Sequence, residues 1–69
     1  MKVKVRFLKD YVGWYNITHL KDSIEELEQW HCSYRGKSSK QRNAEGLIVV
    51  CYGQGEFDVF KVGEDIEIL

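Results

Sequence analysis

In residues 2–8 of the chain, KVKVRFL, hydrophobic and basic residues alternate from Lys2 to Phe7. The apolar members share one side of an extended backbone and the basic members share the other: Val3, Val5 and Phe7 against Lys2, Lys4 and Arg6. The pattern predicts a β-strand with one buried and one solvated face. Residues 9–13 favour a turn, and residues 14–20 are rich in the aromatic and β-branched side chains of strands, so the two segments predict a hairpin.

The spacing of apolar residues changes after Leu20. Apolar and aromatic side chains now recur every three or four residues, at Ile24, Leu27, Trp30 and Tyr34, which predicts a helix over residues 23–34 with these side chains in the core. Ser23 and Glu26 have the spacing of a capping box at the start of that helix. Gly36 is the expected end.

Strand patterns return in the last third of the chain. Residues 35–45 have no apolar periodicity and predict a flexible basic loop. Residues 47–52 and 56–62 flank the glycine-containing segment 53–55, which predicts a second hairpin. A short final strand is expected over residues 66–69.

Together these elements predict a single α+β domain over residues 1–69, with one helix packed on a mostly antiparallel sheet of four to five strands. The predicted order is ββαββ(β). In this order of elements the chain resembles the β-grasp or ubiquitin-like arrangement and the ββαββ of immunoglobulin-binding bacterial domains. We expect the first strand to lie beside the last, with its basic row facing Glu64, Asp65 or Glu67.

Charge and composition exclude several functional classes. The chain has ten basic and eleven acidic residues, for a net charge of −1. This balance argues against a general nucleic-acid coat or a polybasic membrane binder. The sequence contains no segment as long and apolar as a membrane span or a secretory signal, and its two cysteines are too few for a disulfide scaffold. We therefore expect a cytoplasmic protein with reduced thiols.

Metal and thiol chemistry have little support in the spacing of their candidate residues. His19, His31, Cys32 and Cys51 could supply zinc ligands, but they lack the close paired spacing of zinc sites. A reactive thiol at Cys32 lacks a recognisable orienting group. We expect no metal, no cofactor and no enzymatic activity.

Nucleic-acid binding is the second functional hypothesis. The candidate residues belong to two basic clusters, one on the first strand and one in the loop: Lys2, Lys4 and Arg6, and Arg35, Lys37, Lys40 and Arg42. Clustered cations can bind phosphates locally, and Tyr11 or Trp14 could stack on bases. The alternative is that the first row forms cross-strand ion pairs and that the loop is only a solvated connector.

Protein binding is the leading hypothesis, because the strands of the second hairpin are apolar on both faces. A single helix covers one face, and the other needs the segment around Trp14, a second copy of the chain, or another protein. The candidate contact residues are Trp14, Ile48, Val50, Tyr52 and Phe60. The expected function is a small non-enzymatic module that covers a surface of another protein. In size and in its mixed charge patches, it resembles the accessory proteins and inhibitors that phages and other mobile elements encode.

Overall fold

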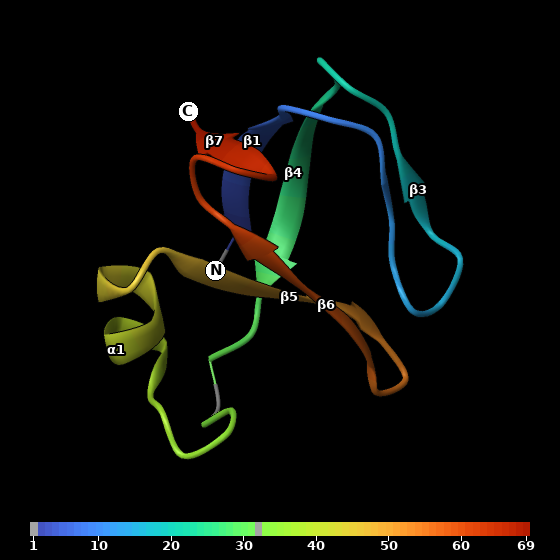
Figure 1. The fold of residues 1–69 in the computed structure, drawn as a ribbon. Helices are drawn as coiled ribbons and strands as arrows, with labels where there is room; N and C mark the ends of the chain where they lie inside the picture. Colours follow the sequence, from blue (N-terminus) through green and yellow to red (C-terminus); the bar gives the residue numbers. More distant parts are fainter. Residues whose placement is uncertain (1, 32) are drawn as a thin grey trace.

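The computed structural model describes residues 2–31 and 33–69, which form a small α+β domain with a five-stranded antiparallel sheet and one short helix (Figure 1). The elements follow one another as β1 (Lys2–Phe7), β2 (Tyr11–Val12), β3 (Thr18–His19), β4 (Ile24–Gln29), α1 (Ser39–Ala44), β5 (Leu47–Gly53), β6 (Glu56–Lys61) and β7 (Ile66–Ile68). The strand order in the main sheet is β6-β5-β4-β1-β7, and β2 pairs with β3 in a separate two-stranded sheet.

β1 has the alternation that its sequence predicts, and its position beside the last strand is confirmed. It pairs with β7 on one side and with β4 on the other, antiparallel in both cases. Arg6 Nη2 lies 2.8 Å from Glu67 Oε2 on β7. Lys2 and Lys4 instead lie opposite Glu28 and Glu26 on β4, so the basic row of β1 is matched by acidic residues from two strands.

The helix predicted over residues 23–34 is wrong, because most of that segment forms strand β4. Its inward positions alternate as a strand requires, but Glu25 and Gln29 are polar and only Leu27 is apolar. Pairing with β1 and β5 outweighs the local helical spacing. The predicted apolar stripe is not a core face as a whole, because Ile24 is 57% exposed whereas Leu27 is buried.

The helix lies instead in the segment that predicted a flexible loop. Ser38 caps α1: its hydroxyl accepts from the Gln41 backbone N–H, and the Gln41 side chain accepts from the Ser38 backbone N–H. The ββαββ order is therefore not observed, since four strands precede α1. The β-grasp resemblance, which depended on that order, is not confirmed.

The segment between β1 and β4 is longer and more ordered than a tight hairpin. β2 falls in the predicted turn, and only Thr18–His19 of the predicted second strand is paired, with Tyr11–Val12. Backbone bonds from Phe7 N to Ser23 O and from Asp22 N to Phe7 O close its base. Figure 1 shows that the segment between β1 and β4, which carries β2 and β3, lies well apart from α1.

The β5–β6 hairpin is confirmed, and together with β1, β4 and β7 it forms the core. The buried apolar cluster consists of Val5, Phe7, Leu27, Ile48, Val50, Phe60 and Ile66. Val49, on the opposite face of β5, is also buried. In the part of the chain that the structure describes, no helix has the length and apolar character needed to cross a bilayer.

Candidate interaction surface

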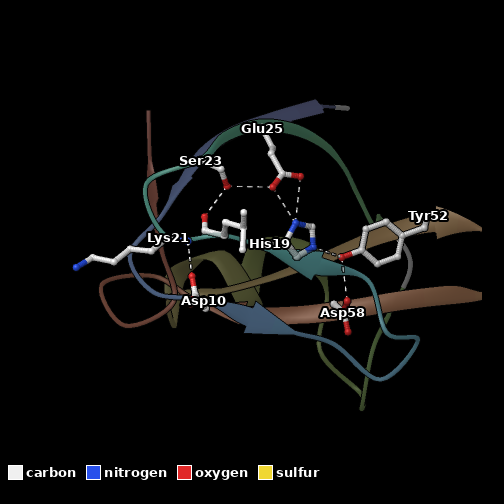
Figure 2. A network of polar contacts seen from close by, with 8 residues as sticks. Asp10, His19, Lys21, Ser23, Glu25, Tyr52 and Asp58 are labelled. Carbon is white, nitrogen blue, oxygen red and sulfur yellow. Dashed lines mark hydrogen bonds and ion pairs between the residues drawn. The ribbon is translucent and has the colours of Figure 1, made fainter.

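A chain of hydrogen-bonded polar side chains, buried at His19 and Asp58 and half-buried at Glu25 and Tyr52, runs from β4 to β6 (Figure 2). His19 of β3 is 2% exposed, and its ring stacks on Phe7 at a centroid distance of 4.4 Å. His19 Nδ1 lies 3.0 and 2.9 Å from the two carboxylate oxygens of Glu25, and Nε2 lies 3.1 Å from the Tyr52 hydroxyl. Tyr52 donates to Asp58 Oδ2 at 2.9 Å. We call these four residues the His19 network.

The His19 network favours the neutral form of its phenol. Burial, followed by the hydrogen bond to Asp58, raises the pKa of Tyr52 far above its ordinary value. Burial also raises the pKa of Tyr11, whose ring packs edge-on against Phe60 and whose hydroxyl donates to Val59 O. Tyr52 is therefore suited to hold a hydrogen bond and not to act as a phenolate nucleophile.

Asp58 connects the His19 network to the loop between β2 and β3. Its carboxylate is 1% exposed, and its Oδ1 accepts from the Trp14 backbone N–H at 3.3 Å. The preceding residue, Gly13, lies so close that a Cβ atom there would overlap the Asp58 carboxylate. Glycine is required at this position because a side chain would displace a buried, hydrogen-bonded group.

At this loop, four aromatic side chains gather around one ring of β6. Phe57 is at the centre, and its centroid lies 5.5 Å from Trp14, 6.4 Å from Tyr15, 6.1 Å from Trp30 and 5.4 Å from Tyr34. These are tilted or edge-to-face contacts at favourable separations. Trp14 is 67% exposed and Tyr15 is 39% exposed. We call these five residues the Phe57 cluster.

The Phe57 cluster lies on the far side of β6 from the core. Phe57 precedes Asp58 in an extended strand, so the two side chains point to opposite faces. Asp58 and Phe60 face the His19 network and the buried apolar cluster, whereas Phe57 faces outward towards the surrounding rings. The β2–β3 loop thus reaches around the edge of the sheet to place Trp14 against Phe57.

A short turn and the helix hold the remaining rings in place. Tyr34 and Lys37 exchange two backbone hydrogen bonds across a turn in which Arg35 and Gly36 both have positive φ, at 52° and 77°. Such a turn favours glycine. The Arg42 guanidinium of α1 is 2% exposed and donates to Lys37 O at 2.7 Å and to Trp30 O at 2.9 Å. It thereby joins the segments that carry Trp30 and Tyr34.

Comparisons with protein-family models, with curated proteins and with solved structures give no significant match.

The candidate protein-contact residues separate into three groups. Trp14 is exposed and belongs to the Phe57 cluster. Tyr52 is part of the His19 network. The other three are buried in the core, at 6%, 0% and 0% exposure, and do not form a surface in this fold: Ile48, Val50 and Phe60. A strand that is apolar on both faces here reflects burial on both sides.

The basic candidates are likewise distributed over several environments. Arg6 pairs with Glu67, and Lys37 pairs with Glu45. Arg42 is buried and bound to backbone carbonyls, so it does not belong to a phosphate-binding surface in this fold. The Arg35 guanidinium lies 5.5 Å from the centre of the Tyr34 ring, and Lys40 is exposed on α1.

The zinc and thiol candidates are not brought together among the described residues. Residues 2–31 and 33–69 contain no group of three or more His, Cys, Asp or Glu side chains that could hold a metal ion. Both nitrogens of His19 are engaged by Glu25 and Tyr52, and Cys51 is half-buried in β5. Cys32 lies outside the described residues.

Most residues of the His19 network and the Phe57 cluster were not candidates from the sequence. Glu25 and Trp30 lie in the segment that predicts a helix, and nothing in the sequence analysis selects Asp58. The available signal for Asp58 was its position: it shares a strand face with Phe60, where a polar residue is exceptional and needs a buried partner. No comparable local signal brings Tyr34 to Phe57, because that contact depends on the turn and on α1.

Proposed function

We propose that this chain is a small, non-enzymatic protein-binding module and that the Phe57 cluster is its contact surface. The observation that carries the proposal is the exposure of Trp14, which keeps 67% of its surface accessible although its ring packs against Phe57. Tryptophan and tyrosine contribute disproportionately to the binding energy of protein interfaces. A cluster of them held by neighbouring rings gives apolar contact at a small cost in side-chain entropy.

The distribution of charge supports a protein partner over a polyanion. Basic side chains form ion pairs along the sheet and at the helix, at Arg6–Glu67, Lys9–Asp65, Lys37–Glu45 and Lys61–Glu64. The net charge of the chain is −1. Binding to nucleic acid draws most of its affinity from unpaired cations that neutralise phosphates, and this pattern of pairing disfavours it.

The mode of action that fits such a surface is occlusion of a site on the partner. The chain is small, and the rings of the Phe57 cluster come from several separate segments, with Trp14 and Tyr15 exposed and the others half-buried, so they form a patch and not a single protruding peptide. An accessory protein or inhibitor of a phage or another mobile element would act in this way.

Single-stranded nucleic acid is the second candidate, favoured by one contact. Arg35 lies over the Tyr34 ring at the border of the Phe57 cluster. Aromatic side chains next to arginine are typical of surfaces that stack unpaired bases.

The two candidates are separated by panning a phage-displayed random-peptide library on the wild-type protein and by titrating a short oligo(dT) under the same conditions. We expect enriched peptides whose affinity falls by about tenfold or more in Trp14→Ala, as for an interface tryptophan. Oligo(dT) is expected not to bind at physiological salt.

Leu20→Ala is the matched control, because Leu20 is 62% exposed and is not part of the Phe57 cluster. It should bind the enriched peptides as the wild type does. Peptides that bind Trp14→Ala and the wild type equally would refute the proposed surface. Salt-dependent oligo(dT) binding that is lost in Trp14→Ala and in Arg35→Gln would establish the second candidate in its place.

A further inference from the structure

With both of its carboxylates ionised, the His19 network is fully hydrogen-bonded only with one particular placement of its protons. Asp58 is a buried carboxylate, and each of its oxygens faces one donor: the Trp14 backbone N–H at Oδ1 and the Tyr52 hydroxyl at Oδ2. A buried carboxylate without donors is costly. Tyr52 has a single hydrogen to give, and since Asp58 receives it, the phenol oxygen is left as an acceptor.

Both ring nitrogens of His19 must then carry hydrogen. Nε2 faces the phenol oxygen of Tyr52, which accepts, and Nδ1 faces both oxygens of the Glu25 carboxylate, which also accept. The side chains that surround the ring are Glu25 from β4, Tyr52 from β5, Tyr11 from β2, and the apolar rings of Phe7 and Phe60. Glu25 is the charged group in contact with the ring, and Asp58 lies one hydrogen bond beyond it.

We propose that the proton on His19 controls the Phe57 cluster, by fixing the loop of Trp14 through Tyr52 and Asp58. This inference rests on the proposed function of the Phe57 cluster and names its regulation. When His19 loses a proton to bulk water and keeps Nδ1–H towards Glu25, Nε2 becomes an acceptor. The Tyr52 hydrogen then turns from Asp58 to His19.

Loss of the Tyr52 hydrogen weakens the anchor of the β2–β3 loop. Asp58 Oδ2 would face a lone pair of the phenol, and the remaining donor to the carboxylate would be the Trp14 N–H at 3.3 Å. Asp58 also packs directly against Gly13, so any shift of its carboxylate moves the residue before Trp14. The loop is fixed with His19 charged and loosened with His19 neutral, and binding at the Phe57 cluster weakens when His19 loses this proton.

The test uses NMR of the free, full-length wild-type protein, recorded over a series of pH values. The ring nitrogens of His19 report its protonation, and the Trp14 backbone amide and indole signals report the loop. We expect the Trp14 signals to change with the same midpoint as His19. Once corrected for intrinsic exchange, protection of the Trp14 amide should fall by about tenfold on the alkaline side, as for loss of one charge-assisted bond.

Two controls isolate the connection. His31, the other histidine of the chain, is exposed, and its titration should leave Trp14 unchanged. In Tyr52→Phe, which keeps the ring and removes the hydroxyl, the His19 signals should still titrate while the Trp14 signals stay constant. Trp14 signals that follow His31, or that titrate equally in Tyr52→Phe, would overturn the inference.

The outcome also separates this inference from the proposed function, because the measurement needs no partner. A His19 ring that shows one protonated and one unprotonated nitrogen throughout the pH range would refute the proton control and leave peptide binding unaffected. The Trp14 signals could instead change together with those of His19 while every enriched peptide binds Trp14→Ala as well as the wild type. That result would support the connection within the protein and refute the binding surface.

Discussion

The His19 network and the Phe57 cluster lie on opposite faces of β6. They differ in how their side chains interact and in how far they are exposed to water. In the network, the buried side chains of His19 and Asp58 are joined by hydrogen bonds through Tyr52, and His19 is also bonded to Glu25. In the cluster, aromatic rings are in mutual contact while Trp14 and Tyr15 stay accessible to water. Polar groups are buried on one face and apolar rings are exposed on the other.

This difference shows which face stabilises the fold and which is available for recognition. A buried polar chain with matched donors and acceptors specifies one arrangement of the strands around it, because any unmatched group would be costly. Exposed rings contribute less to folding, since much of their surface stays hydrated. Asp58 and Phe57 are adjacent in the sequence, and the alternation of a single strand assigns one to each face.

The largest contrast is expected between a core phenylalanine and the exposed tryptophan. Phe60→Ala should lower the free energy of unfolding by about 3–5 kcal/mol, because its ring is fully buried against Phe7, Tyr11 and His19. Trp14→Ala should lower it by about 1 kcal/mol or less, as for surface contacts. Urea denaturation of both variants measures the difference. Equal losses would mean that the Phe57 cluster is part of the core.

A smaller effect is expected where α1 supports the Phe57 cluster. Arg42→Gln should cost about 1.5–3 kcal/mol, because it removes charged hydrogen bonds to the Lys37 and Trp30 carbonyl oxygens. Lys40→Gln is the matched control, because Lys40 lies two residues before Arg42 on α1 and is exposed; it should change stability by about 0.5 kcal/mol or less. A neutral Arg42→Gln would show that the guanidinium does not hold these segments.

The smallest effect concerns alkaline pH. Burial and the Asp58 hydrogen bond raise the pKa of Tyr52 in the folded state, whereas an unfolded tyrosine ionises near pH 10. The unfolded chain therefore loses this proton first as pH rises. The contribution of this group to the free energy of unfolding should not change with pH below about pH 10, and the free energy of unfolding should decrease above it.

Tyr52→Phe tests that assignment, since it removes the ionising hydroxyl. The free energy of unfolding of the variant should fall less steeply above about pH 10 than that of the wild type, with Tyr11 accounting for part of the remaining slope. Denaturation curves recorded at several alkaline pH values give both slopes. Identical slopes would show that Tyr52 ionises equally in the folded and unfolded chain.

The parts of the fold that could be predicted are those whose secondary structure is determined by residues close together in the sequence. β1 alternates without exception, and the β5–β6 hairpin has apolar strands around a turn with Gly53 and Gly55. The position of β1 beside β7 followed from opposite charges, and the Arg6–Glu67 pair confirms it.

β4 and α1 were not predictable in the same way, because contacts distant in sequence decide them. Glu25 and Gln29 interrupt the apolar face of β4 since they bind His19 and Asn43, which no local pattern reveals. In α1 the residues carry no apolar stripe at all, and the buried member is Arg42. Its sequence did contain one usable signal, the capping-box spacing of Ser38 and Gln41.

The Phe57 cluster depends even more on such contacts. Trp14 could be selected from the sequence as an exposed aromatic residue, but the rings around Phe57 come from the β2–β3 loop, the residue after β4, and the turn before α1. Only the folded chain brings these segments together. The same holds for Ile48, Val50 and Phe60, whose apolar character is equally typical of a core and of an interface.

The central claim is that the exposed rings around Phe57 are where a partner binds, and NMR mapping tests it most directly. An enriched peptide is titrated into isotope-labelled wild-type protein, and the chemical-shift changes are assigned to residues. We expect the largest changes at Trp14, Tyr15, Tyr34 and Phe57. Changes concentrated instead on the Lys2, Lys4 and Arg6 face of β1, with the Phe57 cluster unaffected, would contradict the account.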